Sequence, residues 1–137
     1  MIKKVVVIGG GHGQSLICRA LKQIDNITIS AIVTVADDGG STGRLRKQFH
    51  IPAMGDIRNV LISLSEKESV MRDLMDYRFA TLGNEDIDVQ GHNLGNLILT
   101  ALTEETGSFL EARQVASDVL KVKGKIIPAT TEIITLY

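Results

Sequence analysis

Four clusters of glycine and polar residues have the residue types of a phosphate-binding site. The first follows the apolar run at residues 5–8 and reads Gly9, Gly10, Gly11, His12, Gly13, Gln14, Ser15. Glycines let a backbone approach a phosphate closely, and the N-terminus of a following helix presents free N–H groups to the anion. The spacing departs from the G-x-G-x-x-G fingerprint, so a tight turn that serves packing alone is the alternative. His12 and Ser15 are candidate donors to the phosphate.

The second cluster combines carboxylates with glycines and an arginine. It reads Asp37, Asp38, Gly39, Gly40, Ser41, Thr42, Gly43, Arg44. Asp37 stands 24 residues after Gly13, close to the spacing at which an acidic residue holds a ribose hydroxyl in dinucleotide sites. The paired aspartates could instead hold a divalent metal or act as a base, and a solvated Asp-Gly turn is the plain alternative. Arg44 is a candidate fork for a phosphate.

The third cluster, residues 54–59, begins a predicted helix with Gly55 and Asp56. Asp56 either caps this helix or lies, together with Arg58 and Asn59, in the same crevice as the first two clusters. Both interpretations stay open on sequence alone.

The fourth cluster, residues 91–96, begins another predicted helix. His92 and Asn96 are four residues apart and share a helix face, where an imidazole and amides suit sugar or phosphate hydroxyls. Capping of the helix by Asn93 is the alternative. One cysteine and three scattered histidines lack the ligand spacing of a zinc site, and the sequence contains no serine–histidine–acid set.

The elements around the first two clusters predict where they lie. Residues 5–8 indicate a central strand buried on both faces, residues 15–23 a helix, and residues 27–36 a second strand. This βαβ order predicts a Rossmann-like α/β fold, an open and mostly parallel sheet with helices on both faces. Because ligands bind beyond the carboxyl ends of such strands, both clusters are expected on the same rim.

The rest of the chain predicts further helices and two strands around Pro128. The inward face of the first helix is expected to carry Leu16, Ile17, Ala20, Leu21 and Ile24, while Ser108 is expected to cap the last helix. The helices are expected at residues 44–49, 57–67, 69–79, 92–102 and 108–121, the strands at 125–127 and 132–137, and loops at 37–43 and 80–91.

Composition narrows the class of protein. With 137 residues, of which 44% are hydrophobic, the chain is expected to form a single domain over residues 1–137, and its end within an apolar strand suggests the N-terminal portion of a longer chain. A net charge of −1 argues against nucleic acid as a partner. The single Cys18, the short apolar run at the N-terminus and the lack of a membrane-spanning run together predict a cytoplasmic protein without membrane insertion.

The clusters together resemble one known family. The strings VVVIGGGHGQS, ADDGGSTGRLR, MGDIRN, YRF, GHNLGN and KGKIIPATTE are similar, in this order, to those of the YvcK-like gluconeogenesis factors. These proteins share a superfamily with CofD, the 2-phospho-L-lactate transferase of deazaflavin coenzyme synthesis. Here His12 and Gln14 replace the more usual threonine and leucine, and Asn93 replaces serine.

The resemblance implies a regulatory protein that binds a nucleotide sugar such as UDP-N-acetylglucosamine and supports cell shape and cell-wall synthesis on gluconeogenic carbon sources. It implies that the residues at 9–13 hold phosphates, that Asp37 and Asp38 face the nucleotide, and that Asn93 and Asn96 border the crevice. Binding is expected to need no cofactor. A homo-oligomer and cell-wall regulatory proteins are candidate partners.

Two other function classes stay open. A CofD-like transferase would use Asp37 or Asp38 to hold Mg²⁺ or as a base, and would transfer a phospholactyl group from a nucleotide diphosphate. An NAD-binding protein is the third interpretation, against which the missing G-x-G-x-x-G spacing counts.

Overall fold

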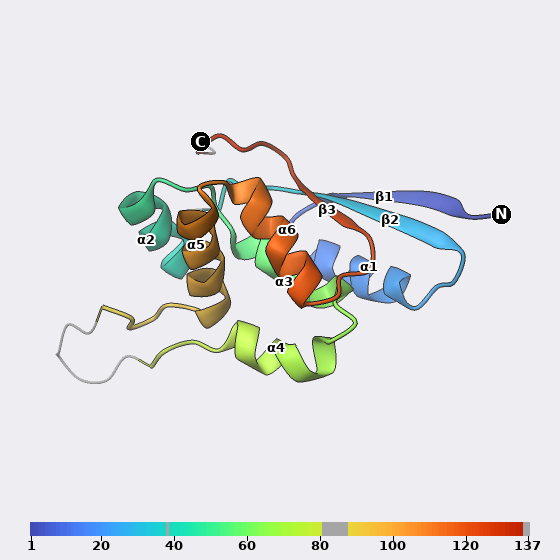
Figure 1. Ribbon diagram of the computed structural model, residues 1–137, viewed down its shortest axis with the longest axis horizontal. Helices are drawn as coiled ribbons and strands as arrows, with labels where there is room; N and C mark the ends of the chain where they lie inside the picture. Colours follow the sequence, from blue (N-terminus) through green and yellow to red (C-terminus); the bar gives the residue numbers. More distant parts are fainter. Residues whose placement is uncertain (38, 81–87, 136–137) are drawn as a thin grey trace.

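The computed structural model describes residues 1–37, 39–80 and 88–135, which form an α/β fold around one open parallel sheet (Figure 1). Within these residues the sheet has the strand order β1-β2-β3. The strands are β1 (Lys3–Gly9), β2 (Ile27–Val33) and β3 (Lys125–Pro128). The helices are α1 (Gly11–Lys22), α2 (Gly40–Phe49), α3 (Gly55–Leu64), α4 (Glu68–Asp76), α5 (Leu94–Thr106) and α6 (Phe109–Val119). The predicted α/β class and parallel sheet are confirmed.

The predicted βαβ unit is formed by β1, α1 and β2. Strands β1 and β2 pair in parallel, with Val5 opposite Ile29 and Val7 opposite Ala31, and β2 pairs in parallel with β3, with Ala31 opposite Ile126. The turn between β1 and α1 is shorter than expected, because the helix begins at Gly11 and includes most of the glycine cluster in its first turn. Because the three strands are parallel, their carboxyl ends lie at one rim of the sheet, and α1 begins there directly after β1.

Several predicted boundaries differ from the structure. The second strand ends at Val33 instead of residue 36, and α2 begins at Gly40, inside the predicted loop. Residues 132–135 form no strand. Helix α5 begins at Leu94, with Asn93 as its N-cap, while Ser108 caps α6 as expected. Asp56 lies in the first turn of α3 and Met54 occupies the N-cap, so the prediction of Asp56 as a cap is wrong.

The predicted inward face of α1 is wrong except at Leu21, which packs against the core, whereas Ala20 and Ile24 are exposed. Leu16 and Ile17 are 62% and 53% exposed, while Gln14 and Cys18 are buried. The side-chain amide of Gln14 donates to the carbonyl oxygens of Val7 (3.3 Å) and Ile32 (2.9 Å), so it faces the strands. These hydrogen bonds fix which face of α1 points toward the sheet, and a hydrophobic pattern cannot predict them.

Strand β1 is covered on one face only. The described helices gather on one side of the sheet, the lower side in the view of Figure 1, and Val7, Ala31 and Ile126 are buried against them. On the other face Val6 is 58% and Ile8 is 76% exposed. The expectations of a central strand buried on both faces and of helices on both faces therefore do not hold for the described residues.

No helix in the described ranges is long and apolar enough to cross a membrane.

Candidate functional site

The N-termini of four helices meet at the rim of the sheet. The backbone N–H of Gly11 at the start of α1 faces the carboxylate of Asp56 in α3 and lowers its pKa. At the start of α3, Gly55 lies against Thr42 of α2, and the backbone N–H of Asn93 before α5 donates to Ser41 of α2 (3.2 Å). Because a helix N-terminus carries partial positive charge and unpaired N–H groups, this convergence favours an anion.

Two adjoining hollows open among these helix ends. The first, which we name the rim cavity, has a volume of about 330 Å³ and is lined by Asp37, Gly39, Gly40, Ser41, Thr42, Gly55, Asp56, Arg58, Asn59, Arg78 and Asn96. The second, which we name the α1–α3 groove, has a volume of about 410 Å³ and is lined by His12, Ser15, Leu16, Arg19, Arg58, Asn59, Ile62, Asp76, Arg78 and Asn93. Arg58, Asn59 and Arg78 line both. The structure therefore brings together all four clusters that the sequence singled out.

The glycines of the first cluster have different roles. A Cβ at Gly10 would clash with the methyl group of Thr34 and lie 3.2 Å from an oxygen of Asp56, so Gly10 allows close packing within the protein. Gly11 has φ +65°, a left-handed conformation that favours glycine, and a Cβ there or at Gly13 would meet nothing within 4 Å. Packing thus explains Gly10, while the space beside Gly11 and Gly13 is open to a ligand.

Arg58 is the most buried cation of the site. It is 9% exposed, and its guanidinium donates to the side-chain oxygens of Asn96 (2.9 Å) and Asn59 (3.1 Å). Its Nε lies 3.7 Å from Asp76. Burial lowers the pKa of Arg58; the carboxylate of Asp76 opposes this shift and the charge of Arg78 reinforces it. The two hydrogen bonds go to neutral amides and Asp76 lies at the longer distance, so part of the guanidinium charge stays available to an anion nearby.

A buried hydrogen-bond network joins α2 to α5. Ser41 Oγ lies 2.8 Å from His92 Nδ1 and accepts hydrogen bonds from the backbone N–H of Asn93 and from Asn96 Nδ2 (3.3 Å). Two accepted bonds fill the lone pairs of the hydroxyl, so its proton goes to Nδ1 and His92 carries its own proton on Nε2. Burial lowers the pKa of His92, as do the charges of Arg44 and Arg78. Ser41 and His92 therefore position the helix ends. The hydrogen bonds of Ser41 Oγ are all used within the protein, so the pair is not arranged as a nucleophile and its base.

Two carboxylates of the rim cavity lie near each other. Burial raises the pKa of Asp56, the N–H of Gly11 opposes this shift, and the charge of Asp37 adds to it. Asp37 Oδ1 accepts a hydrogen bond from the backbone N–H of Gly39 (3.1 Å). Asp38 lies outside the described residues. Among residues 1–37, 39–80 and 88–135, no three acidic, histidine or cysteine side chains gather as a metal site.

Some predicted site residues bind the protein itself. The amide of Gln14 holds the strands, as described above, and Ser15 Oγ donates back to the carbonyl of Gly11 (3.2 Å), although Ser15 also lines the α1–α3 groove. The guanidinium of Arg44 donates to the carbonyl oxygens of Gln90 and Asp88 and lines neither hollow. Gly9, Gly10, Gly11, Gly13 and His92 also line neither hollow. The structure therefore places Gln14 and Arg44 in supporting positions.

Arg78 is a site residue that the sequence interpretation missed. It lines both hollows, donates to the carbonyl of Gly91 (2.7 Å), and has no ion pair within the described residues. The string YRF carried part of the family resemblance, and its arginine could have been singled out as a site residue. Arg78 follows shortly after the end of α4 and pairs with Asn93 just before α5. A guanidinium at the junction of two hollows that has no carboxylate partner among the described residues suits an anionic ligand.

Known proteins resemble this chain along almost all of its length. The family model described as 2-phospho-L-lactate transferase CofD matches residues 5–137. The gluconeogenesis factor of Bacillus subtilis is 49% identical over 98% of this chain, and that of Listeria monocytogenes is 50% identical over 94%. A crystal structure of a protein from Bacillus halodurans superimposes with a TM-score of 0.86 at 49% identity over 96% of this chain.

The chain spans about 40% of the length of these relatives: 41% of the Bacillus subtilis protein, 38% of the Listeria monocytogenes protein and 41% of the Bacillus halodurans chain. The predicted resemblance to the gluconeogenesis factors and to CofD is confirmed by these matches, which agree in sequence and in fold. The chain belongs to the CofD family.

Proposed function

We propose that the rim cavity binds the phosphates of a nucleotide sugar, of which UDP-N-acetylglucosamine is the first candidate. The observation that carries this proposal is the convergence of the N-termini of α2, α3 and α5 with Arg58 and Arg78 around one hollow at the carboxyl rim of the sheet. Phosphate oxygens accept hydrogen bonds from unpaired backbone N–H groups and from arginine forks. The hollow is also within the size range of small-ligand sites, on the order of 300 Å³ and more.

In this proposal the first turn of α2 holds the phosphates, because Gly40 lines the rim cavity and the space beside it is open. The first turn of α1 borders the adjoining α1–α3 groove through His12 and Ser15. Arg78 supplies a guanidinium that no carboxylate of the described residues neutralises. Asp37, which is exposed at the mouth, accepts a hydrogen bond from a ribose hydroxyl. Asn96 and Ser41 hold Arg58 and the helix ends in place.

We further propose a regulatory role without turnover in the cytoplasm, in support of cell-wall synthesis and cell shape during gluconeogenic growth. The names of the relatives, gluconeogenesis factors, support the link to gluconeogenesis. The saturated Ser41–His92 pair supports binding over catalysis, because no described side chain in the rim cavity is poised as a nucleophile.

A CofD-like transferase is the second candidate, favoured by the family model and by the neighbouring carboxylates of Asp37 and Asp56. Two carboxylates with phosphate oxygens and water form the oxygen-rich environment that Mg²⁺ prefers, so these side chains fit the metal of such a transferase. Mg²⁺ would supply charge neutralisation at a diphosphate.

Isothermal titration calorimetry on the full natural chain separates the two. The first proposal expects UDP-N-acetylglucosamine to bind in the presence of EDTA and to be recovered unchanged after hours of incubation. Binding that depends on Mg²⁺, together with consumption of a nucleotide diphosphate when a deazaflavin is added, would favour the transferase. Absence of binding by any nucleoside diphosphate would contradict both.

A further inference from the structure

The α1–α3 groove is a separate hollow from the rim cavity and has an excess of positive charge. Its lining includes three guanidinium groups, those of Arg19, Arg58 and Arg78, against one carboxylate, that of Asp76. Counting three positive charges and one negative charge leaves a net charge of +2, with histidine neutral. A nucleotide phosphate bound at the rim would neutralise part of this charge near Arg58 and Arg78, and would leave Arg19 at the other end of the groove.

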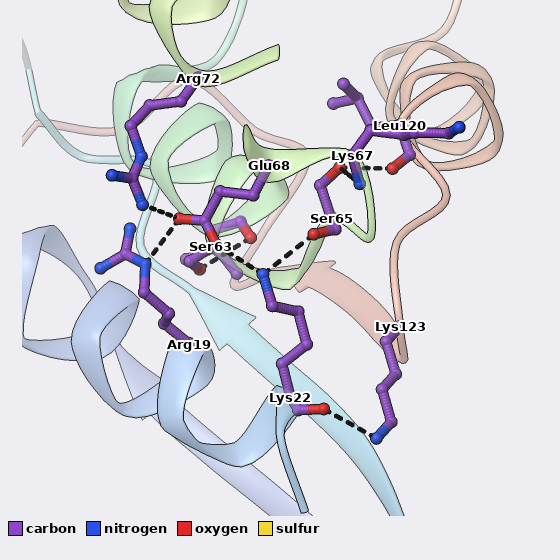
Figure 2. Close-up of polar contacts among 10 residues, drawn as sticks. Arg19, Lys22, Ser63, Ser65, Lys67, Glu68, Arg72, Leu120 and Lys123 are labelled. Carbon is purple, nitrogen blue, oxygen red and sulfur yellow. Dashed lines mark hydrogen bonds and ion pairs between the residues drawn. The ribbon is translucent and has the colours of Figure 1, made fainter. Parts of the chain in front are cut away.

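Arg19 is held in a fixed position with part of its guanidinium free. Its Nε donates to Glu68 Oε1 at 2.6 Å. Figure 2 shows Glu68 between Arg19, Lys22 and Arg72, with the two terminal nitrogens of Arg19 on the side away from Lys22. Neither of these nitrogens has a partner within the described residues, and the side chain is 35% exposed. A guanidinium that is already ordered loses less conformational entropy when it binds an anion.

The groove is long enough to reach from the rim to Arg19. His12 and Arg19 both line it and are seven residues apart along α1, a separation of about 10 Å at the rise of an α-helix. Between them Leu16 contributes an exposed apolar wall, and Ile62 of α3 lines the opposite side. A group with an apolar or sugar body and an anionic end fits such a lining.

We propose that the α1–α3 groove is a second compartment of the binding site and holds a carboxylate or phosphate group through Arg19. The inference rests on the proposed function, because Arg78 at the junction then contacts the rim phosphates and Arg19, at the other end of the groove, is left for the second anionic group. This anionic group belongs either to the distal end of the nucleotide ligand or to a separate small acid that binds beside the nucleotide.

Calorimetry with defined probes distinguishes the two sources. In the first arm, UDP-glucuronic acid and UDP-glucose, which differ by one carboxylate, are titrated into the full natural chain. In the second arm, phosphoenolpyruvate, which carries a carboxylate and a phosphate, is titrated into protein saturated with UDP. The inference expects at least one arm to show a carboxylate-dependent interaction that Arg19→Gln weakens by roughly tenfold or more, as for the loss of a charge-assisted hydrogen bond.

Two further variants separate binding from folding. Arg72→Gln removes another guanidinium from the same Glu68 carboxylate, but Arg72 does not line the groove, so this variant is expected to bind the probes like the wild type. Leu16→Glu places a carboxylate at an exposed position of the groove wall, and is expected to weaken binding of the anionic group while UDP still binds.

The outcomes divide as follows. Sensitivity of either arm to Arg19→Gln and to Leu16→Glu, but not to Arg72→Gln, supports the inference. Equal affinities for UDP-glucuronic acid and UDP-glucose, together with no binding of phosphoenolpyruvate, overturn the inference. If UDP still binds in that case, the proposed function stands. Equal losses of affinity in Arg19→Gln and Arg72→Gln also overturn the inference. If UDP does not bind, the proposed function fails, and phosphoenolpyruvate titrated into the ligand-free protein decides the inference alone.

Discussion

Replacement of Glu68 by glutamine tests whether one buried carboxylate fastens α4 to α1. Glu68 is 8% exposed and accepts hydrogen bonds from Arg19 (2.6 Å), Lys22 (2.5 Å) and Arg72. Burial by itself would raise its pKa, but the three cations outweigh burial and lower the pKa from an ordinary value of 4.5 to about 2. Glu68→Gln keeps the size of the side chain and leaves three positive groups without a counter-charge.

The magnitude follows from the pKa. A fall from 4.5 to about 2 corresponds to about 3 kcal/mol of interaction that favours the ionised carboxylate in the folded state. The side chains of Arg19 and Arg72 are 35% and 48% exposed, so solvent screens part of this interaction. We therefore expect Glu68→Gln to lower the free energy of unfolding by about 2 kcal/mol at pH 7.

The sign with pH is fixed by the direction of the shift. Because the folded pKa lies below the unfolded pKa, the stabilisation is fully present above about pH 4.5 and is lost as the pH falls toward 2. Urea unfolding at pH 7 and pH 3.5, followed by circular dichroism, measures both values. Glu66→Gln is the matched control, since Glu66 is exposed and forms no ion pair within the described residues. Equal stability of the two variants at pH 7, or a difference that does not shrink in acid, would refute the reasoning.

Three further perturbations test the site. Gly95→Ala places a Cβ 2.7 Å from Cδ of Arg58, so we expect a loss of about 1–3 kcal/mol in urea unfolding and weaker UDP binding as Arg58 moves. Arg78→Gln should weaken UDP binding by roughly tenfold in calorimetry, whereas Arg44→Gln, whose guanidinium binds the chain itself, should not. Because burial raises the pKa of Asp56, its ionised form is disfavoured in the folded state, so Asp56→Asn should leave the free energy of unfolding at pH 7 unchanged or higher; a loss of more than about 1 kcal/mol in urea would contradict this.

The parts of the fold that depend on residues close together in the sequence were predictable from the sequence. The apolar run before the glycine cluster correctly predicted the β1–α1–β2 unit. Ser108 was correctly predicted to cap α6, where it accepts a hydrogen bond from the N–H of Glu111 at 3.3 Å. The rotation of α1 was not predictable, because it depends on the contact of Gln14 with two strand carbonyls. The Glu68 cluster escaped for the same reason: its lysine and one of its arginines come from α1, more than 40 residues away.

The location of the site at one rim of the sheet was predictable from the sequence, but the contacts that its side chains make were not. Parallel strands bring their carboxyl ends to one rim, so the glycine clusters were expected to meet there, and they do. Which donors stay free was not visible in the sequence. Arg44 matches a phosphate fork by type but holds residues 88 and 90, while Arg78 was passed over although it lines both hollows.

The net charge of the chain is a poor guide to what its rim can bind. A charge of −1 weighs against a protein that coats a nucleic acid by bulk attraction, but a small anion responds to the field within a few ångströms. At the rim that field comes from four helix N-termini and from Arg58 and Arg78, and none of the helix contribution enters a count of ionisable residues. Asp37 and Asp56 oppose it; burial is the main cause of the raised pKa of Asp56, and the charge of Asp37 adds to it. Asp56 faces the N–H of Gly11 and Asp37 accepts from the N–H of Gly39, so both carboxylates lie at the first turns of α1 and α2. In the proposed function we therefore expect a diphosphate at the rim to lie nearest Arg78, unless a cation stands between it and those carboxylates.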